Sequence, residues 1–218
     1  ARAKAHEGAH DRSDLQKSFN YDLFKVIEYR KQGKEVPADI PESVKDYADI
    51  WKKNMDTQHD SLVDAGVAGF TKERKFKWYM PHVWKHGKLK RMIDKHGEDF
   101  VTDLFAKGYA SRGKAILANG ETNITHTSHK LAKRQIEWIR NQADDGIDQY
   151  LPVQDSKSKQ RLDLDTTVEL DGVSILDLLD TDVPTVATRY SKRSSGWIGL
   201  TKATNGMISN DLDIDVFR

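Results

Sequence analysis

Cysteine is absent from the 218-residue sequence. Without cysteine the chain cannot form a disulfide framework, a thiolate metal site or a cysteine nucleophile. The sequence also contains no run of 18 apolar residues, so no segment is expected to cross a membrane as a helix. Neither a Walker-type phosphate loop nor a glycine-rich dinucleotide fingerprint is present.

The chain also lacks a strong net charge, because its 35 basic residues are nearly balanced by 34 acidic ones. A dedicated DNA-binding domain would usually be clearly basic. The charge is nevertheless uneven: residues 72–95 are rich in lysine and arginine, and residues 163–182 contain seven acidic residues and no basic one. Such asymmetry favours self-assembly, or the lining of a path, over bulk electrostatic capture of a partner.

Apolar residues make up 37% of the chain and charged residues 32%, with a mean hydropathy of −0.72. This balance indicates a high ratio of surface to core, as in an elongated helical body or a piece of a larger protein. The aromatic content of 9% argues against full disorder.

Apolar periodicity predicts helices over residues 14–32, 42–64, 86–96, 98–110 and 127–143, and further ones over 175–179 and 183–194. Ser13 or Asp14 can cap the first helix, Gly33 ends it, Pro41 marks the start of the second, and Thr127 caps the 127–143 helix. Helical spacing in the first helix is followed by Leu15, Phe19, Leu23, Val26, Ile27 and Arg30, and the second helix has a stripe of Val44, Tyr47, Ala48, Trp51, Met55 and Leu62.

The pair Asp171-Gly172, flanked by β-branched residues, predicts a tight β-hairpin near residues 166–175, after which Ser174 can cap a short helix. Further turns are predicted at Asn119-Gly120, Ser195-Gly196 and Asn205-Gly206. The expected fold is mainly α, an elongated multi-helix segment with this small hairpin. We expect an N-terminal helical hairpin at 1–70, a basic and aromatic strap with helices at 71–150, and the hairpin with short helices at 151–218.

Basic and aromatic residues interleave between Lys72 and Arg91. The residue before a proline is disfavoured in the helical region, so Pro81 predicts an extended segment over 74–84. Such a segment can follow a nucleic-acid backbone and stack on bases. It can equally be a strap whose rings anchor in a core while the ammonium groups stay in water. The candidate contacts to double-stranded DNA are Lys75, Lys77, Lys85, Lys88, Lys90 and Arg91.

Residues 6–10 match the HExxH pattern, in which His6 and His10 would share one face of a helix and bind zinc while Glu7 polarises water. Gly8 weakens a helix at this place, and the short pattern for a third ligand is absent, although Glu28 has a spacing that fits the longer one. We expect an exposed polar segment here and no bound cofactor. A zinc-dependent peptidase that uses this motif is one alternative function, and a nucleic-acid-binding module centred on residues 72–91 is the other.

Two other histidine pairs are expected to be structural. His82 and His86 have i,i+4 spacing, and Pro81 could begin a helix at His82, but no carboxylate is suitably close in sequence. His126 and His129 flank a predicted helix start, where capping or packing is expected. The basic stretch that begins at Arg189 contains serines without a histidine and an acid nearby, so no catalytic residue is predicted.

The order of several short motifs resembles the central region of the largest internal core protein of autographivirus-type short-tailed phages. The resemblance covers most of the chain, and its weight lies in the order of the motifs. The motifs are Tyr79-Met80-Pro81-His82-Val83-Trp84, Gly97-Glu98, Asp171-Gly172, Asp177-Leu178-Leu179, Pro184, Arg189-Tyr190 and Ile198-Gly199-Leu200, with Met55-Asp56-Thr57 upstream.

The resemblance implies that the chain is a middle segment of a longer virion protein and not an enzyme in itself. Proteins of that family are packed in the capsid above the portal, are ejected before the genome, and help to form a conduit for DNA across the host envelope. The implied partners are further copies of the chain, other internal core proteins, the portal region and double-stranded DNA. Some members carry a peptidoglycan transglycosylase at the far N-terminus, and no residue of this chain is assigned to that activity.

Overall fold

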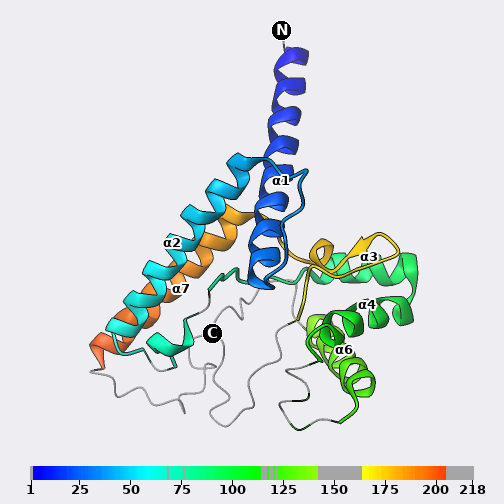
Figure 1. The fold of residues 1–218 in the computed structure, drawn as a ribbon. Coiled ribbons are helices and arrows are strands. Elements are labelled where there is room, and N and C mark those ends of the chain that lie inside the picture. The colour runs from blue at the N-terminus through cyan, green and yellow to red at the C-terminus, as the bar shows by residue number, and fades with distance from the viewer. Residues whose placement is uncertain are drawn as a thin grey trace. The chain divides into compact units, whose positions relative to one another are not determined.

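The computed structural model describes residues 2–67, 69–75, 77–113, 117, 120, 122–141 and 164–204, with the backbone alone at residues 2–12, 74 and 193. These residues form six α-helices and one two-stranded antiparallel sheet (Figure 1). The prediction of a mainly α fold with a small hairpin is confirmed.

The described residues divide into two units. Unit 1 contains residues 2–81 and 181–204, and unit 2 contains residues 82–141 and 164–180. These bounds differ from the segments 1–70, 71–150 and 151–218 expected from the sequence. They differ because the last helix packs on a helix of the N-terminal hairpin, a long-range contact that composition does not reveal.

Unit 1 is built from α1 (Arg2–Lys31), α2 (Glu42–Asp64) and α7 (Val183–Ala203), and α2 lies beside both other helices (Figure 1). Two predicted limits are wrong. Helix α1 does not start at Ser13 or Asp14, because alanine, lysine and arginine favour helix over most of the preceding residues. Helix α7 runs through Ser195-Gly196, since an isolated glycine weakens a helix by only about 1 kcal/mol.

The core of unit 1 lies where α1 and α2 face each other, with Leu23, Phe24 and Ile27 of α1 fully buried. Helix α2 contributes Val44, Ala48, Trp51, Met55 and Leu62, as its pattern predicted. Leu15 and Tyr47, which lie on the two stripes, are 71% and 46% exposed. Periodicity shows which face of a helix is apolar, but it does not show how far the partner helix extends along that face.

Unit 2 is built from α3 (His86–His96), α4 (Glu98–Ala110) and α6 (Ile124–Arg140). Its core joins Leu104 and Phe105 of α4 to Ile136 of α6 and Ile175. Helix α6 begins before the predicted Thr127, because the side chain of Asn123 accepts a hydrogen bond from the His126 amide at 2.9 Å and caps the helix there. The predicted residues 142 and 143 lie outside the described residues.

The predicted hairpin is confirmed. Strands β1 (Glu169–Leu170) and β2 (Val173–Ser174) pair through Leu170 and Val173. Asp171 and Gly172 take positive φ values of 49° and 75°, as a two-residue hairpin turn requires. Ser174 then caps the 3-10 helix η2 (Ile175–Leu178) in a capping box with Asp177.

Gly120 has a φ of 83°, in agreement with the predicted turn, whereas Asn119 and the pair Asn205-Gly206 lie outside the described residues. Among the helices that the structure describes, none combines the length and hydropathy of a membrane span.

Candidate functional site

The basic and aromatic segment contains all six candidate DNA contacts, and the structure divides it after Pro81. Lys75 and Lys77 belong to unit 1, whereas the other four candidates belong to unit 2. Neither unit therefore presents the complete set, and each half is described with its own unit.

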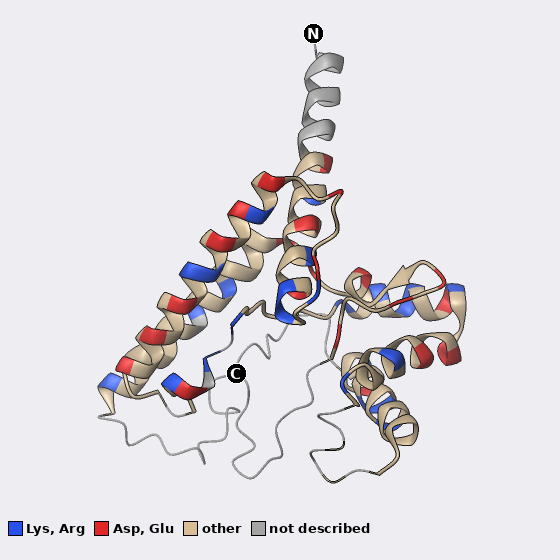
Figure 2. Ribbon diagram, viewed as in Figure 1, with Lys and Arg blue, Asp and Glu red and all other residues tan. Residues whose placement is uncertain are grey.

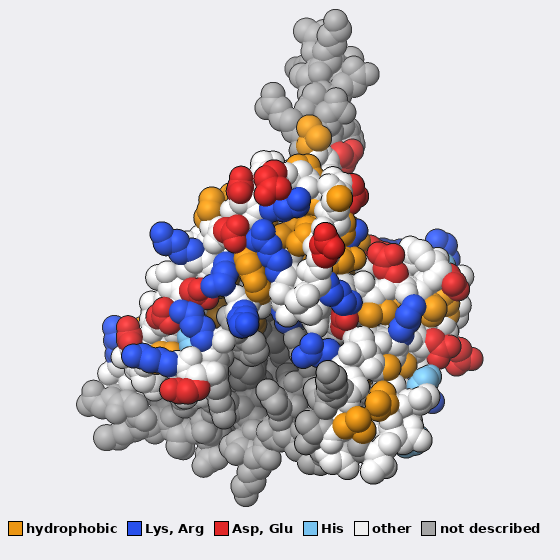
Figure 3. Space-filling view, viewed as in Figure 1, with side chains coloured by type: hydrophobic (Ala, Val, Ile, Leu, Met, Phe, Trp, Pro, Cys, Tyr) orange, Lys and Arg blue, Asp and Glu red, His pale blue; other side chains and the backbone are white. Residues whose placement is uncertain are grey.

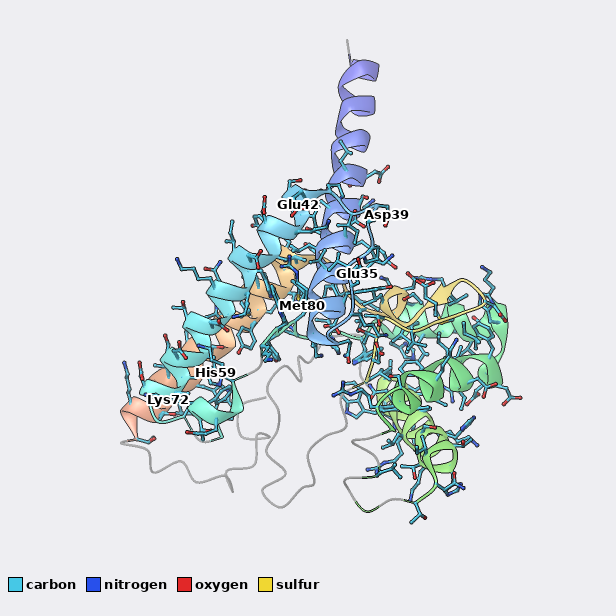
Figure 4. All side chains as sticks on the ribbon, viewed as in Figure 1. Glu35, Asp39, Glu42, His59, Lys72 and Met80 are labelled. Atoms are coloured by element: carbon cyan, nitrogen blue, oxygen red, sulfur yellow. The ribbon has the colours of Figure 1, made fainter. Side chains whose placement is uncertain are left out.

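In unit 1 the chain reverses direction after α2 and returns along that helix. Figure 4 shows this course, from Glu42 down α2 to His59, then to Lys72, and back to Met80. The 3-10 turn η1 (Lys72–Arg74) precedes the returning segment, and the structure assigns no helix to residues 77–85. We call residues 75–81 the strap; Phe76 lies outside the described residues.

The strap is fastened to α2 at both ends. Lys75 places its ammonium group 2.8 Å from both carboxylate oxygens of Asp60. The hydrogen bond from Lys75 lowers the pKa of the Asp60 carboxyl, and the same bond raises the pKa of Lys75. At the other end, the buried indole of Trp51 donates a hydrogen bond to the carbonyl oxygen of Tyr79 at 2.9 Å.

Between these anchors the ring of Trp78 lies under cations from two helices. The Arg30 guanidinium is 4.7 Å from the ring centroid, and the Lys52 ammonium is 6.0 Å from it. Both cations are also paired with acids of α2: Arg30 with Asp49, and Lys52 with Asp56. Lys75 is paired with Asp60 in the same way.

Acidic and basic positions are mixed along α2 (Figure 2), and the face of the protein in Figure 3 shows side chains of the two signs interleaved. This arrangement matches the strap interpretation of the sequence, in which the aromatic rings anchor and the cations stay near water. A nucleic-acid backbone would have to compete with the α2 carboxylates for these cations.

Replacing Trp51 by phenylalanine is expected to loosen the strap. The substitution removes the donor to the Tyr79 carbonyl from a buried site, which costs about 1–2 kcal/mol. We expect trypsin to cleave after Lys77 faster in Trp51→Phe than in the unmodified chain. Trp197→Phe, at a partly buried tryptophan of α7 in the same unit, should leave that rate unchanged. Equal cleavage rates in Trp51→Phe and the unmodified chain would contradict the anchoring role.

In unit 2 two of the candidate lysines are used internally. The Lys85 ammonium is 2.6 Å from a carboxylate oxygen of Asp180, whose side chain is 13% exposed. The Lys88 ammonium donates to the carbonyl oxygen of Leu179 at 2.6 Å. Burial lowers the pKa of Lys88, and the nearby charges of Asp180 and Asp177 oppose this shift. Part of the acidic stretch of the sequence thus neutralises part of the basic stretch.

The backbones of the same two stretches pair with each other. The Val83 carbonyl accepts from the Asp180 amide at 2.7 Å, and the Lys85 amide donates to the Leu178 carbonyl at 3.0 Å. Trp84 and Leu179 form the antiparallel bridge between these hydrogen bonds. We call residues 83–85 together with 178–180 the neck, because they are the first and last described residues of unit 2 apart from His82.

The two remaining candidates of unit 2, Lys90 and Arg91, lie on exposed positions of α3. Contact between these side chains and DNA stays a prediction.

The histidine pairs have the following places. Helix α3 begins at His86, as the predicted 86–96 helix does, so His82 precedes it and Pro81 does not start a helix there. The ring of His82 contacts Trp84 edge to face at a centroid distance of 6.1 Å. His129 lies inside α6, where its ring nitrogens approach the Thr125 carbonyl at 2.9 Å and a carboxylate oxygen of Asp103 at 3.1 Å.

The HExxH residues lie within the span of α1, but the side chains of His6, Glu7 and His10 are outside the described residues. The zinc alternative therefore stays a prediction. In the part of the chain whose side chains the structure describes, no three histidine, aspartate or glutamate residues are grouped as metal ligands.

A buried side-chain contact of unit 2 was not predicted from the sequence. Asp165 is 2% exposed and accepts hydrogen bonds from the Thr167 amide, the Thr167 hydroxyl and the Ser111 hydroxyl. Its own amide donates to the Gly108 carbonyl at 3.3 Å. The Asp-x-Thr spacing is a known signal for a turn closed by a side chain, and it could have identified Asp165.

The Arg189-Tyr190 element lies on α7, where Tyr190 is 3% exposed and packs on Tyr79 of the strap at a centroid distance of 5.5 Å. Burial raises the pKa of the Tyr190 phenol, and a hydrogen bond with Ser194 partly offsets this. Because the pKa of Tyr190 is higher in the folded state than in the unfolded state, the neutral phenol contributes stability below pH 10. This stability is lost as the pH rises through the pKa of the folded state.

The free energy of unfolding of unit 1 is therefore expected to fall above pH 10, and less steeply in Tyr190→Phe. One proton fewer is linked to unfolding in that variant, so the two slopes should differ by up to about 1.4 kcal/mol per pH unit. Denaturant titrations between pH 9 and 12 measure these slopes. Tyr47→Phe, at an exposed tyrosine of the same unit, should match the unmodified chain, and equal slopes for Tyr190→Phe would contradict the expectation.

No protein-family model matches the sequence, and no curated protein is significantly similar to it.

Proposed function

We propose that the chain is a structural segment of an internal virion protein of a short-tailed phage. In this proposal the protein is packed in the capsid core and ejected, and it helps to form the channel through which the genome crosses the host envelope. It assembles with further copies of itself and with other core proteins next to the portal. The segment performs no chemical step in this role.

The observation that supports the proposal is that the motifs behind the resemblance pack against one another within each unit. In unit 1, Tyr79 packs on Tyr190, a residue 111 positions later in the sequence. In unit 2, Trp84 pairs with Leu179, 95 positions later. Some motifs that are short and unspecific one by one thus form long-range contacts of the fold, which gives their order a structural reason.

The internal use of charge favours this role over nucleic-acid binding. Lys75, Lys85 and Lys88 are engaged by Asp60, Asp180 and the Leu179 carbonyl, respectively. Cations held in this way stabilise the fold and offer less to a phosphate backbone. A dedicated DNA-binding surface would instead leave them free to release counterions on binding.

Mass spectrometry of purified particles of the phage that encodes the chain tests the proposal. Peptides of this chain are expected in DNA-filled particles, to be depleted from particles that have released their DNA, and to appear in the envelope fraction of newly infected cells. Recovery of the peptides from the soluble fraction of infected cells alone, and never from particles, would contradict the proposal.

A genetic test uses two glycines of unit 2. A β-carbon at Gly108 would lie 2.8 Å from the side chains of Ile175 and Leu164, whereas a β-carbon at Gly87 would meet nothing within 4 Å. Phage that encode Gly108→Val are expected to package DNA but to deliver it poorly, while Gly87→Ala phage infect normally. Full infectivity of Gly108→Val phage would show that unit 2 is not needed for delivery.

A further inference from the structure

The neck brings the two ends of unit 2 together. Among the residues that the structure describes, the chain leaves unit 1 after Pro81 and returns to it at Thr181. Two residues beyond Pro81 and one residue before Thr181, Val83 and Asp180 are joined by the 2.7 Å hydrogen bond of the neck. In the order of the described residues, unit 2 therefore lies between two parts of unit 1, and its first and last described segments are fastened to each other.

The neck belongs to the folded core of unit 2. Leu178 and Leu179 are 1% and 0% exposed, and the ring of Trp84 packs on Phe105 of α4 at a centroid distance of 5.5 Å. The Lys85–Asp180 ion pair and the hydrogen bond from Lys88 to Leu179 add two side-chain fastenings. Because these contacts depend on the core, the neck is expected to open when unit 2 unfolds.

Opening the neck changes the length of chain that connects the strap to α7. With the neck closed, the path from Tyr79 to Val183, the first residue of α7, runs through Val83, across the hydrogen bond to Asp180, and on to Val183. This path contains about seven residues. With the neck open, the connection is about 100 residues long. Loop-closure entropy scales with 3/2 of the logarithm of length, so the probability that α7 meets its partners falls on the order of 50-fold.

We propose that the neck is a clasp through which the folding of unit 2 controls how firmly α7 is held in unit 1. The contacts that hold α7 lie within unit 1, and they include Tyr190 on Tyr79 and the 2.7 Å hydrogen bond from Gln58 to Ser191. Unit 2 strengthens them by shortening the connection, and it needs no contact with α7 to do so. The pair α1 and α2 is connected by the short segment 32–41 and does not depend on the clasp.

Hydrogen exchange of the full chain, measured peptide by peptide, tests this coupling. The variant Gly108→Val is expected to unfold unit 2, which is seen as loss of amide protection in α4 and α6. In the same sample, amides of α7 should exchange roughly 50-fold faster, while amides of α1 and α2 change far less. Gly87→Ala, the matched glycine variant of unit 2, should accelerate exchange in none of these helices.

A disulfide across the neck separates the clasp from other effects of unfolding. The chain has no cysteine, so Val83→Cys with Asp180→Cys introduces its only thiols. Residues opposed in this way have Cα atoms about 4.5–5.5 Å apart, within the range for a disulfide. In the Gly108→Val background, oxidation should restore the protection of α7 while α4 and α6 still exchange freely, and reduction should abolish it again.

Three results would overturn the proposal: α7 exchange that is unchanged when unit 2 is unfolded, equal acceleration in α1, α2 and α7, or an oxidised neck that leaves α7 unprotected. If Gly108→Val cannot be purified, the double variant Lys85→Ala with Asp180→Ala loosens the neck with the core intact. It should accelerate α7 by a smaller factor without affecting α6, and unchanged α7 exchange in that variant would count against the clasp.

Discussion

Gly108→Ala is expected to lower the free energy of unfolding of unit 2 by about 3 kcal/mol, the upper end of the usual cost of adding volume to a packed core. The added β-carbon would lie 2.8 Å from Cδ1 of Ile175, 2.8 Å from Cδ1 of Leu164 and 2.9 Å from the carbonyl oxygen of Asp165. The two methyl groups can turn away to some extent. The carbonyl oxygen cannot, because it is part of the backbone whose amide is bonded to Gly108 itself.

Thermal and urea unfolding, followed through the amide exchange of α4 and α6, measure this loss. Gly87→Ala is the control, since it adds the same methyl group to a helix of the same unit and meets nothing within 4 Å. The control should be neutral or stabilise α3 by up to about 1 kcal/mol, because alanine favours helix over glycine. Equal stabilities of Gly108→Ala and Gly87→Ala would show that α4 does not approach residues 164–175 as closely as described.

Asp165→Ala is expected to destabilise unit 2 by a similar amount, about 3 kcal/mol. The substitution removes the acceptor for the Thr167 amide at 3.1 Å and for the Thr167 hydroxyl at 2.6 Å, both in a buried turn. It also removes a carboxylate oxygen that accepts from Ser111 at 3.1 Å. Leaving a buried donor without its acceptor costs about 1–3 kcal/mol, and hydrogen bonds to a charged acceptor lie toward the upper end.

Asp165→Asn is the matched control, because its amide oxygen can still accept from the Thr167 amide and hydroxyl. We expect it to lose roughly 1 kcal/mol, since the charge and one acceptor oxygen are removed. Urea titrations that follow unit 2 measure both variants. If Asp165→Ala were as stable as Asp165→Asn, the turn at 165–167 would not depend on the side chain.

The local signals of the sequence predicted most elements of the fold. Asp171-Gly172 has the chemistry of a two-residue hairpin turn, and Ser174 with Asp177 forms the capping box that its spacing allows. The predicted helix ends were wrong where a residue typical of a cap or a break lies among residues that favour helix, as at Ser13 and Gly196. At these places the propensity of the neighbouring residues outweighed the single residue that favoured an end.

The candidate site was less predictable, because partners distant in sequence decide its properties. Lys75 and Lys85 look alike in the sequence, but one is paired with an acid of α2 and the other with Asp180. Gly108 looks like a weak position in a helix, and only the approach of Leu164 and Ile175 gives it a role. No periodicity or composition encodes which distant segment returns to a given helix.

The strap and α2 run side by side over a shared length, which restricts how this region can gain or lose residues. A chain of four residues, the separation of Lys75 and Tyr79, can reach at most about 14 Å, and the nine helical residues between Trp51 and Asp60 span about 13.5 Å. Removing two residues from the strap would reduce this maximal reach by about 7 Å. Loss of about four residues from α2 would shorten the helix by about 6 Å, which nearly matches that change. Because four residues are close to one helical turn, the remaining side chains would keep nearly the same direction. Insertions and deletions in the two segments are therefore expected to occur together in related sequences, in the ratio of two strap residues to four helix residues.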